Sequence, residues 1–488
     1  MDSVTRQRRF LVDASWRRPE NGNIIFSGSP IKMFHLSASG KNIAELLEAG
    51  QPLPHGHEAL TGRLLEAGAI HPLTTVGETG PYTLKDITVV IPAFVQSQRD
   101  ATMLSKLIRQ CVGVMRIVVV DDASTHPLAT PESALVIALP TNGGPGAARN
   151  TGLGHVTTPL VAFIDLDVAL SATTLSELLP LFIDAKLGVA APRIMCADSG
   201  DYPNTTANTT ANTTATTTAI AAQIAQYEKT RSPLDLGAVA ARIAPGTRVG
   251  YAPTAVWLCR TEAIRGVNGF DAEMRVGEDV DALWRIIAAG WHCRFAPNAI
   301  ATHAPRPTLH GFVQQRRLYG RSAAALASRH KGAVAPVRVS GYSAGAWLLV
   351  ACGLPFLGLL VGAYTVVALS RKIRVAPNAM QESLRLAGLG NLHAAKILAS
   401  AITRTWWPIA ITFAIFSRRA RRVVLVAALA PAMHEWWSQR PSIDPLRYLA
   451  LRLIDDVSYG LGVWEGAIAA RSPEALMPDL SSWPRRDS

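Results

Sequence analysis

Two carboxylates stand one residue apart where an apolar run ends: Asp165 and Asp167 follow Val-Ala-Phe-Ile at 161–164. Residues i and i+2 of a strand point the same way, so both acids can converge on one point at the end of the strand. Two adjacent negative charges beside an apolar core are unfavourable unless a cation lies between them. Because oxygen ligands favour hard divalent ions, the pair predicts a Mg²⁺ or Mn²⁺ site that holds a diphosphate.

Two further polar segments follow apolar runs. At the end of one run, Asp121 can accept the imide N–H of a uracil ring, and Asp122 can cap the turn that follows. In the glycine-rich segment 142–152, small residues let a ligand approach the backbone, and Arg149 supplies a fixed cation. Together these segments predict a site for a nucleotide and its phosphates.

A third acidic group lies about a hundred residues downstream. Glu278 and Asp279 fall on the first turn of an expected helix, where the positive end of the helix dipole keeps carboxylates ionised. An ionised carboxylate that faces a substrate hydroxyl is a general base. His303 follows a strand-like segment, 291–301, and can approach the metal or the diphosphate.

Alternating strands and helices are expected to position these residues. Four apolar runs separated by short helices predict a mainly parallel α/β sheet, whose ligands bind beyond the carboxyl ends of the strands. The runs are 86–92, 116–122, 134–139 and 161–165. Before them, short strands and two short helices, 42–49 and 57–67, predict a small winged-helix-like domain over 1–83.

These motifs carry a resemblance. Pro92 with Arg99, followed in order by the acidic pairs and the glycine-rich loop, resembles the motif set of family 2, inverting, GT-A glycosyltransferases. The resemblance implies a nucleotide-sugar donor bound through a divalent cation, with Asp279 as the base and Glu278 beside it. The donor-binding residues that it implies are Pro92, Asp121, Asp122, Asn142, Gly144, Arg149 and Asp165, and the metal-binding residues are Asp165, Asp167 and His303.

One segment departs from the pattern of processive members of this family. Gln314 and Arg317 keep two positions of their Q-x-x-R-W segment, but Leu318 replaces the tryptophan. We therefore expect no synthase that extrudes its product through a membrane pore.

The order of the parts resembles the glycosyltransferases of mycofactocin biosynthesis, which have a PqqD-like N-terminal domain. This resemblance implies transfer of glucose from UDP-glucose onto a peptide-derived redox cofactor or its precursor, adding β-1,4-linked units. It also implies a peptide or biosynthetic partner for the N-terminal domain. Two alternatives stay open: a transferase acting on a lipid or cell-wall polysaccharide, and a scaffold that binds a nucleotide sugar or peptide without turnover.

The composition and net charge limit the kinds of partner that the protein is expected to bind. The chain has 488 residues and a net charge of +12, which suits an anionic partner or a solvated basic surface. Basic residues do not gather with aromatic ones around the predicted site, so we expect no nucleic-acid binding. Five scattered cysteines and a polar N-terminus without a signal peptide predict a cytoplasmic protein. The low-complexity stretch 200–219 predicts a mobile loop without function.

The last third changes character, so we predict a catalytic domain over 84–335 and a helical membrane-associated region over 336–488. Residues 339–370 carry no charge, and basic residues flank them. Gly353 and Pro355 interrupt this run, which favours a kinked re-entrant or interfacial hairpin at 345–369. Later apolar pieces alternate with tryptophans and the basic cluster 418–422, as in helices that lie on a membrane. These features predict that the protein is located at the cytoplasmic face of the cell membrane.

Overall fold

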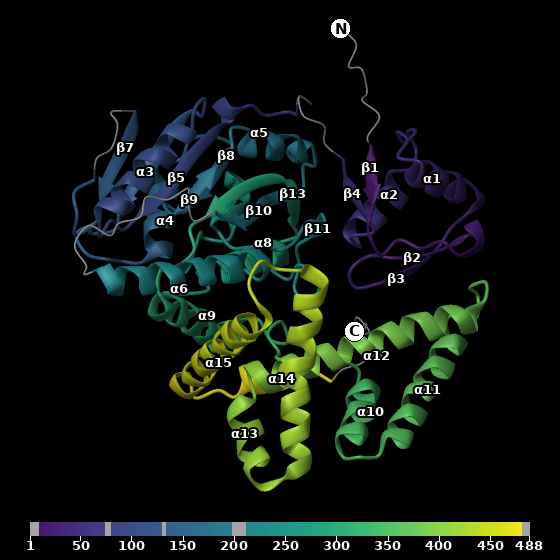
Figure 1. The fold of residues 1–488 in the computed structure, drawn as a ribbon. Coiled ribbons are helices and arrows are strands. Elements are labelled where there is room, and N and C mark those ends of the chain that lie inside the picture. Colours follow the sequence, from purple (N-terminus) through teal and green to yellow (C-terminus); the bar gives the residue numbers. More distant parts are fainter. Residues whose placement is uncertain (1–8, 74–79, 129–132, 198–210, 481–488) are drawn as a thin grey trace. The chain divides into compact units, whose positions relative to one another are not determined.

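The computed structural model describes residues 9–73, 80–128, 133–197 and 211–480. Its contacts divide the chain into two compact units (Figure 1). The sheet unit comprises 1–207 and 231–305, and the helical unit comprises 208–230 and 306–488. The boundary at Pro305 differs from the predicted one at 335, because α9 (Leu309–Arg329) packs along α15 (Pro445–Ala469).

The N-terminal part of the sheet unit has its own apolar core, although the contacts do not separate it as a further unit. Helix α1 begins earlier than predicted, because Ser37 accepts a hydrogen bond from the Gly40 amide and caps it. Strand β4 was not expected and pairs antiparallel with β1. The elements are β1 Phe10–Val12, β2 Ile24–Ser27, β3 Lys32–His35, α1 Ala38–Glu48, α2 Glu58–Glu66 and β4 Ile70–Pro72.

A nine-stranded mixed sheet, counted over the described residues, forms the rest of this unit. Strands β7, β6, β5 and β8 run parallel to one another, so the mainly parallel sheet predicted from the sequence is confirmed. Antiparallel β12 then joins β8 to β10, which pairs parallel with β13. The strands are β5 Ile87–Ala93, β6 Arg116–Asp121, β7 Ala134–Ala138, β8 Leu160–Ile164, β9 Val168–Leu170, β10 Leu187–Cys196, β11 Ala241–Arg242, β12 Val256–Arg260 and β13 His292–His303.

Helices cover both faces of this sheet, because alternate strand residues point to opposite sides (Figure 1). Val89 and Ile91 pack in the cluster that contains residues of α3 and α5, whereas Val90 packs with residues of α4, α7 and α8. The helices are α3 Gln98–Gln110, α4 Pro145–Gly154, α5 Thr174–Leu178, α7 Thr261–Gly266 and α8 Glu278–Ala288. This arrangement directs the loops after the parallel strands, and the start of α4, to one edge of the sheet.

The helical unit contains two helical hairpins, α10–α11 and α13–α14, besides the longer helices α9, α12 and α15 (Figure 1). Among the described residues, no helix combines the length and apolar character that crossing a membrane requires. Gly462 of α15 lies directly against the backbone carbonyl of Arg317 in α9, leaving no room there for a side chain. The remaining helices are α10 Gly341–Ala351, α11 Pro355–Lys372, α12 Ala379–Arg404, α13 Trp407–Phe416 and α14 Arg418–Gln439.

The low-complexity stretch is in part helical, contrary to prediction. Helix α6, Ala211–Thr230, includes the end of the Asn-Thr-Thr-Ala repeat, so the predicted loop is wrong over 211–219. The C-terminal turns of α6 pack on other helices: the buried ring of Tyr227 contacts those of Phe312 and Tyr448. Residues 200–210 lie outside the described part of the chain.

Candidate active site

A buried arginine connects the end of β8 to the start of α8. Arg149 lies on α4, and its guanidinium donates to Glu278 Oε1 at 2.6 Å and to Asp165 Oδ1 at 2.7 Å. The same group lies 5.4 Å from the centre of the Phe270 ring. Helix α4 starts here because Gly144, with φ +87°, turns the chain and Pro145 takes the first helical position. The predicted fixed cation therefore contacts two of the predicted acids.

The paired carboxylates after β8 have different partners. Asp165 bonds to Arg149, whereas Asp167 Oδ2 lies 3.0 Å from His303 Nε2 on β13. Burial raises the pKa of the Asp165 carboxyl; Arg149 opposes this rise, and the charges of Asp167 and Asp279 add to it. The site therefore holds a surplus of negative charge that a cation would offset.

The fit of a metal ion to this site depends on additional ligands. Within the described part of the chain, no three His, Cys, Asp or Glu side chains form a group suited to holding a metal. Asp165, Asp167 and His303, which we predict as the metal-binding residues, thus do not form one closed cage. Asp165 and Asp167 lie close enough for their charges to interact. Two such carboxylates suit a hard divalent ion that completes its coordination with water and with oxygens of a bound diphosphate.

The two acids at the start of α8 differ in burial. Glu278 is 5 % exposed, and burial, together with the neighbouring Asp279 charge, raises its pKa to about 7. Asp279 is half-buried, and its Oδ2 accepts a hydrogen bond of 3.2 Å from the Thr254 amide. Gly277, with φ +83°, lets the chain turn sharply into the helix ahead of both acids. Glu278 therefore holds Arg149, and Asp279 is the acid that a ligand can reach.

The two acids at the end of β6, Asp121 and Asp122, differ in part from their predicted roles. Asp121, not Asp122, caps the turn, because its Oδ1 accepts from the Ser124 amide at 2.9 Å. Asp122 is buried and accepts from the amides of Gly143 and Gly144 at 2.6 and 2.8 Å. The prediction that Asp122 caps the turn is therefore wrong; it fixes the glycine-rich loop instead. Half-buried Asp121 is the one better placed to meet a base.

Two further residues complete this edge. Pro92 and the strand end of β5 lie beside Val120 of β6, in parallel register. Asn142 accepts a 2.9 Å hydrogen bond from Arg275, whose side chain lies over Gly144. Arg275 was not predicted as a site residue; the sequence signal for it was its position three residues before Glu278, in the loop that leads to the acidic helix start.

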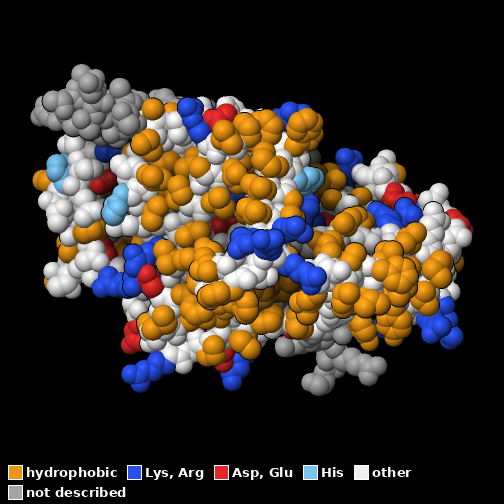
Figure 2. Space-filling model, turned by 60° about the horizontal axis from the view of Figure 1, so that its bottom comes forward, with side chains coloured by type: hydrophobic (Ala, Val, Ile, Leu, Met, Phe, Trp, Pro, Cys, Tyr) orange, Lys and Arg blue, Asp and Glu red, His pale blue; other side chains and the backbone are white. Residues whose placement is uncertain are grey.

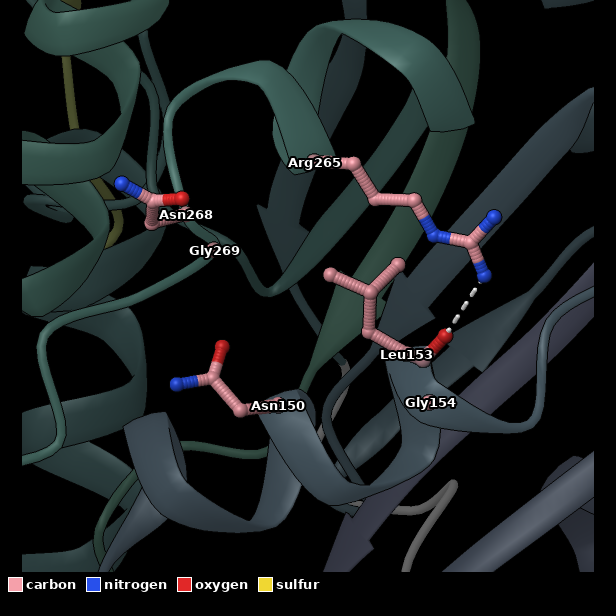
Figure 3. A pocket seen from close by; sticks show the side chains of 6 residues that line it. All are labelled: Asn150, Leu153, Gly154, Arg265, Asn268 and Gly269. Atoms are coloured by element: carbon pink, nitrogen blue, oxygen red, sulfur yellow. Dashed lines mark hydrogen bonds between the residues drawn. The ribbon is translucent and has the colours of Figure 1, made fainter.

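A hollow of about 360 Å³ lies behind α4 (Figure 3). Asn150 at its wall is engaged with the backbone of Phe270, donating to its carbonyl at 2.6 Å and accepting from its amide at 2.8 Å. Arg265 points to the Leu153 carbonyl, 3.2 Å away (Figure 3). The lining contains none of the acids described above: it consists of Asn150, Leu153, Gly154, Arg265, Asn268 and Gly269. This hollow is therefore separate from the candidate site.

Comparison with known proteins identifies the family. The family model for Glycosyl transferase family 2 matches residues 88–238, which include both acidic strand ends and the glycine-rich loop. Pre-mycofactocin glycosyltransferases from two strains of Mycobacterium tuberculosis, CDC 1551 / Oshkosh and H37Rv, are each 35 % identical over 486 residues. Each alignment covers 96 % of this chain and 97 % of the relative. The chain belongs to the pre-mycofactocin glycosyltransferases of family 2. The family predicted from the motifs is thus confirmed.

Solved structures resemble this glycosyltransferase more distantly. The mannosyltransferase PcManGT from Pyrobaculum calidifontis, in complex with GDP-Man and Mn²⁺, is 17 % identical, with a TM-score of 0.37. That alignment covers 78 % of this chain and 94 % of the other. TarS 1-349 of S. aureus in complex with UDP is 18 % identical, covers 49 % of this chain and 65 % of its own, and has a TM-score of 0.30. The assignment of the glycosyltransferase to its family rests on the sequence relatives alone.

Proposed function

We propose that this glycosyltransferase transfers glucose from UDP-glucose to mycofactocin or its precursor and builds a β-1,4-linked oligosaccharide by inversion. The observation that carries the proposal is the pairing of a reachable acid, Asp279, with a buried arginine–carboxylate cluster around Arg149. The name of the sequence relatives supports the acceptor. The motif resemblance supports the nucleotide-sugar donor and the inverting mechanism.

In this proposal Asp279 takes the proton from the acceptor hydroxyl. As the hydroxyl oxygen bonds to the anomeric carbon, the bond from that carbon to the diphosphate oxygen breaks, and the configuration inverts. The Thr254 amide holds the Asp279 carboxylate in place through its 3.2 Å hydrogen bond. Glu278 fixes Arg149, whose guanidinium also donates to Asp165, one of the proposed donor-binding acids.

The donor would be bound by the strand ends on the other side of the cluster. Asp121 would accept the N–H of the base, and Asp165 would face the ribose. Asp167, together with Asp165, would hold Mg²⁺ or Mn²⁺, which stabilises the charge of the leaving diphosphate when it is bound. His303 would orient Asp167 through their 3.0 Å contact.

One observation favours a second acceptor class. The exposed apolar side chains of the helical hairpins suit a lipid or a cell-wall polysaccharide precursor with a lipid tail. The chemistry at Asp279 would be unchanged, because only the molecule carrying the hydroxyl differs. A non-catalytic scaffold is less well supported, because binding alone needs no reachable base beside the donor acids.

Mass spectrometry of reaction products tests these proposals. Purified enzyme is incubated with Mn²⁺ or Mg²⁺, a panel of UDP- and GDP-sugars, and either the mycofactocin precursor or a lipid extract. We expect hexose ladders on the precursor with UDP-glucose, and at least about a hundredfold less product with Asp279→Asn. Sugar on lipid alone would contradict the proposed acceptor, and transfer by neither protein to any acceptor would favour the scaffold.

A further inference from the structure

The two helical hairpins of the helical unit expose apolar side chains next to their turns. In the first, α10–α11, Phe356 is 69 % exposed; in the second, α13–α14, Phe416 is 84 % exposed. None of the ten residues of α13, all of which the structure describes, is buried. The other strongly exposed apolar residues near the turns include Leu348, Leu354, Leu359, Leu360, Phe413, Ile415, Leu425 and Val426. A helix with this composition is stable in water only if something covers it.

The turns of the two hairpins lie side by side. Arg419, in the first turn of α14, donates to the Cys352 carbonyl in the turn between α10 and α11, at 3.1 Å. Arg421 donates to the carbonyls of Ala414 and Ile415 at the end of α13. The two hairpins therefore present one continuous surface, which we call the hairpin surface: 348–360 together with 413–426.

The charge of this surface has one sign. The segments 341–378 and 405–434 contain no Asp or Glu. They do carry exposed basic residues, including Arg418 and Arg422 in the first turns of α14, which follows Phe416 along the chain. Figure 2 shows basic side chains among apolar ones on the face of the molecule toward which the hairpin turns project. Apolar side chains interspersed with guanidinium groups match a layer of anionic lipid headgroups above acyl chains.

We propose that the hairpin surface docks the enzyme on an anionic lipid bilayer, at its cytoplasmic face, without crossing it. Helix α13 has ten residues, so at 1.5 Å per residue it is about 15 Å long, half the roughly 30 Å of a hydrocarbon core. Phe416 and Phe356 enter the outer acyl region, while Arg418 and Arg422 bind phosphates at the headgroup level. A second copy is the less suitable occupant, because a two-fold interface would bring the same basic residues of both copies together.

Vesicle flotation of the full chain tests this proposal, and it does not depend on which sugar or acceptor the enzyme uses. We expect binding to phosphatidylcholine vesicles that contain phosphatidylglycerol, and at least about tenfold weaker binding to phosphatidylcholine alone. Phe416→Asp should lower the affinity for anionic vesicles about tenfold or more, because the variant loses the transfer of an aromatic side chain from water into the acyl region and puts a carboxylate there. Arg418→Gln with Arg422→Gln should reduce binding to anionic vesicles and leave binding to neutral ones unchanged.

Leu446→Asp is the matched control. Leu446 is 77 % exposed but lies at the start of α15, beyond the end of α14 that is farthest from the turn. This variant should bind vesicles as the wild type does, and both variants should keep the wild-type melting temperature. Absence of vesicle binding, or equal loss in the Phe416 and Leu446 variants, would overturn the proposal. So would a wild-type dimer in light scattering that Phe416→Asp converts to a monomer without changing vesicle binding.

Discussion

Two buried arginines, one in each unit, have nearly the same immediate surroundings. Arg149 contacts two carboxylates and a phenylalanine ring, as described above. Arg316 of α9 donates to Glu228 at 2.6 Å, lies 3.3 Å from Asp455, and stacks 4.5 Å from the Phe312 ring. Local pairing therefore does not tell a functional arginine from a structural one.

The difference lies in the next layer of residues. The carboxylates beside Arg316 are 5–6 % exposed, and Tyr227 donates to Asp455 at 3.0 Å, so this cluster is closed. A second cation, Arg404, lies 3.7 Å from Asp455, so two arginines face the two acids. The Asp165 side chain beside Arg149 is 33 % exposed, and further acids lie near it. An excess of negative charge that reaches solvent marks the site, because a ligand cation can still bind there.

The largest effect is expected when Asp279, beside the Arg149 cluster, is replaced, and it should appear in product formation. Asp279→Asn keeps the hydrogen bond from Thr254 but removes the base, so we expect product formation to fall by about 10²–10⁴-fold. The melting temperature should stay the same. Rates by mass spectrometry and melting by circular dichroism check this, with exposed Glu273→Gln as control. A variant with more than a tenth of the wild-type rate would argue against Asp279 as the base.

The closed cluster should respond in stability instead. Arg316→Met leaves buried Glu228 without its cation and leaves Asp455 only Arg404, 3.7 Å away, so we expect a loss of about 3–5 kcal/mol in the free energy of unfolding. Arg317→Met is the adjacent control: Arg317 is exposed and pairs with half-buried Glu465, so we expect a much smaller loss than for Arg316→Met. Urea unfolding measures both. If the folded Arg316 variant lost its turnover selectively, the two arginines would not differ in the way described.

The raised pKa of Glu278 allows the cluster around Arg149 to be tested through the pH dependence of stability. Burial raises this pKa from 4.5 to about 7, so the folded state binds the proton more readily than the unfolded state does. The resulting stabilisation is full below about pH 4.5 and is lost as the pH rises through 7, by no more than about 3 kcal/mol. Glu278→Gln should remove this part of the pH dependence. Unfolding of both proteins at pH 5 and pH 8 measures it; identical slopes would contradict the assignment.

The smallest effect is expected for the histidine that contacts Asp167. His303→Asn should raise the Mn²⁺ or Mg²⁺ concentration needed for half-maximal activity about 10–100-fold, because the Asp167 carboxylate loses its orienting partner. His292, at the other end of β13, forms a similar 3.0 Å pair with Asp184, away from the site. His292→Asn should leave the metal requirement unchanged. An equal shift in both variants would assign His303 a purely structural role.

Much of the site could be predicted because strand ends obey a simple rule. Asp121 and Asp165 follow apolar runs, and the carboxyl ends of parallel strands meet at one edge, so their proximity followed from order alone. The roles of Asp121 and Asp122 could not be separated, since they depend on the turn at Ala123, where φ is +57°. The periodicity of a sequence does not show that a single non-glycine residue such as Ala123 adopts the left-handed backbone conformation.

Helix α6 is a case in which the sequence did not predict the fold correctly. Asn and Thr favour helices weakly, so the repeat at its start predicted a loop. Its later turns carry Tyr227 and Glu228, whose partners Phe312 and Arg316 come from more than eighty residues further along the chain. Contacts made in the folded state therefore override the local preference, and one sequence does not reveal them.

The contact between Gly462 and the Arg317 carbonyl has a mechanical consequence. Two helix backbones that touch directly cannot slide or rotate against each other as helices separated by flexible side chains can. Helix α9, which carries Gln314 and Arg317, is thereby held in one register along α15. A methyl group added at position 462 would meet the Arg317 carbonyl, so α9 and α15 would have to move apart, and Gln314 and Arg317 would shift with α9.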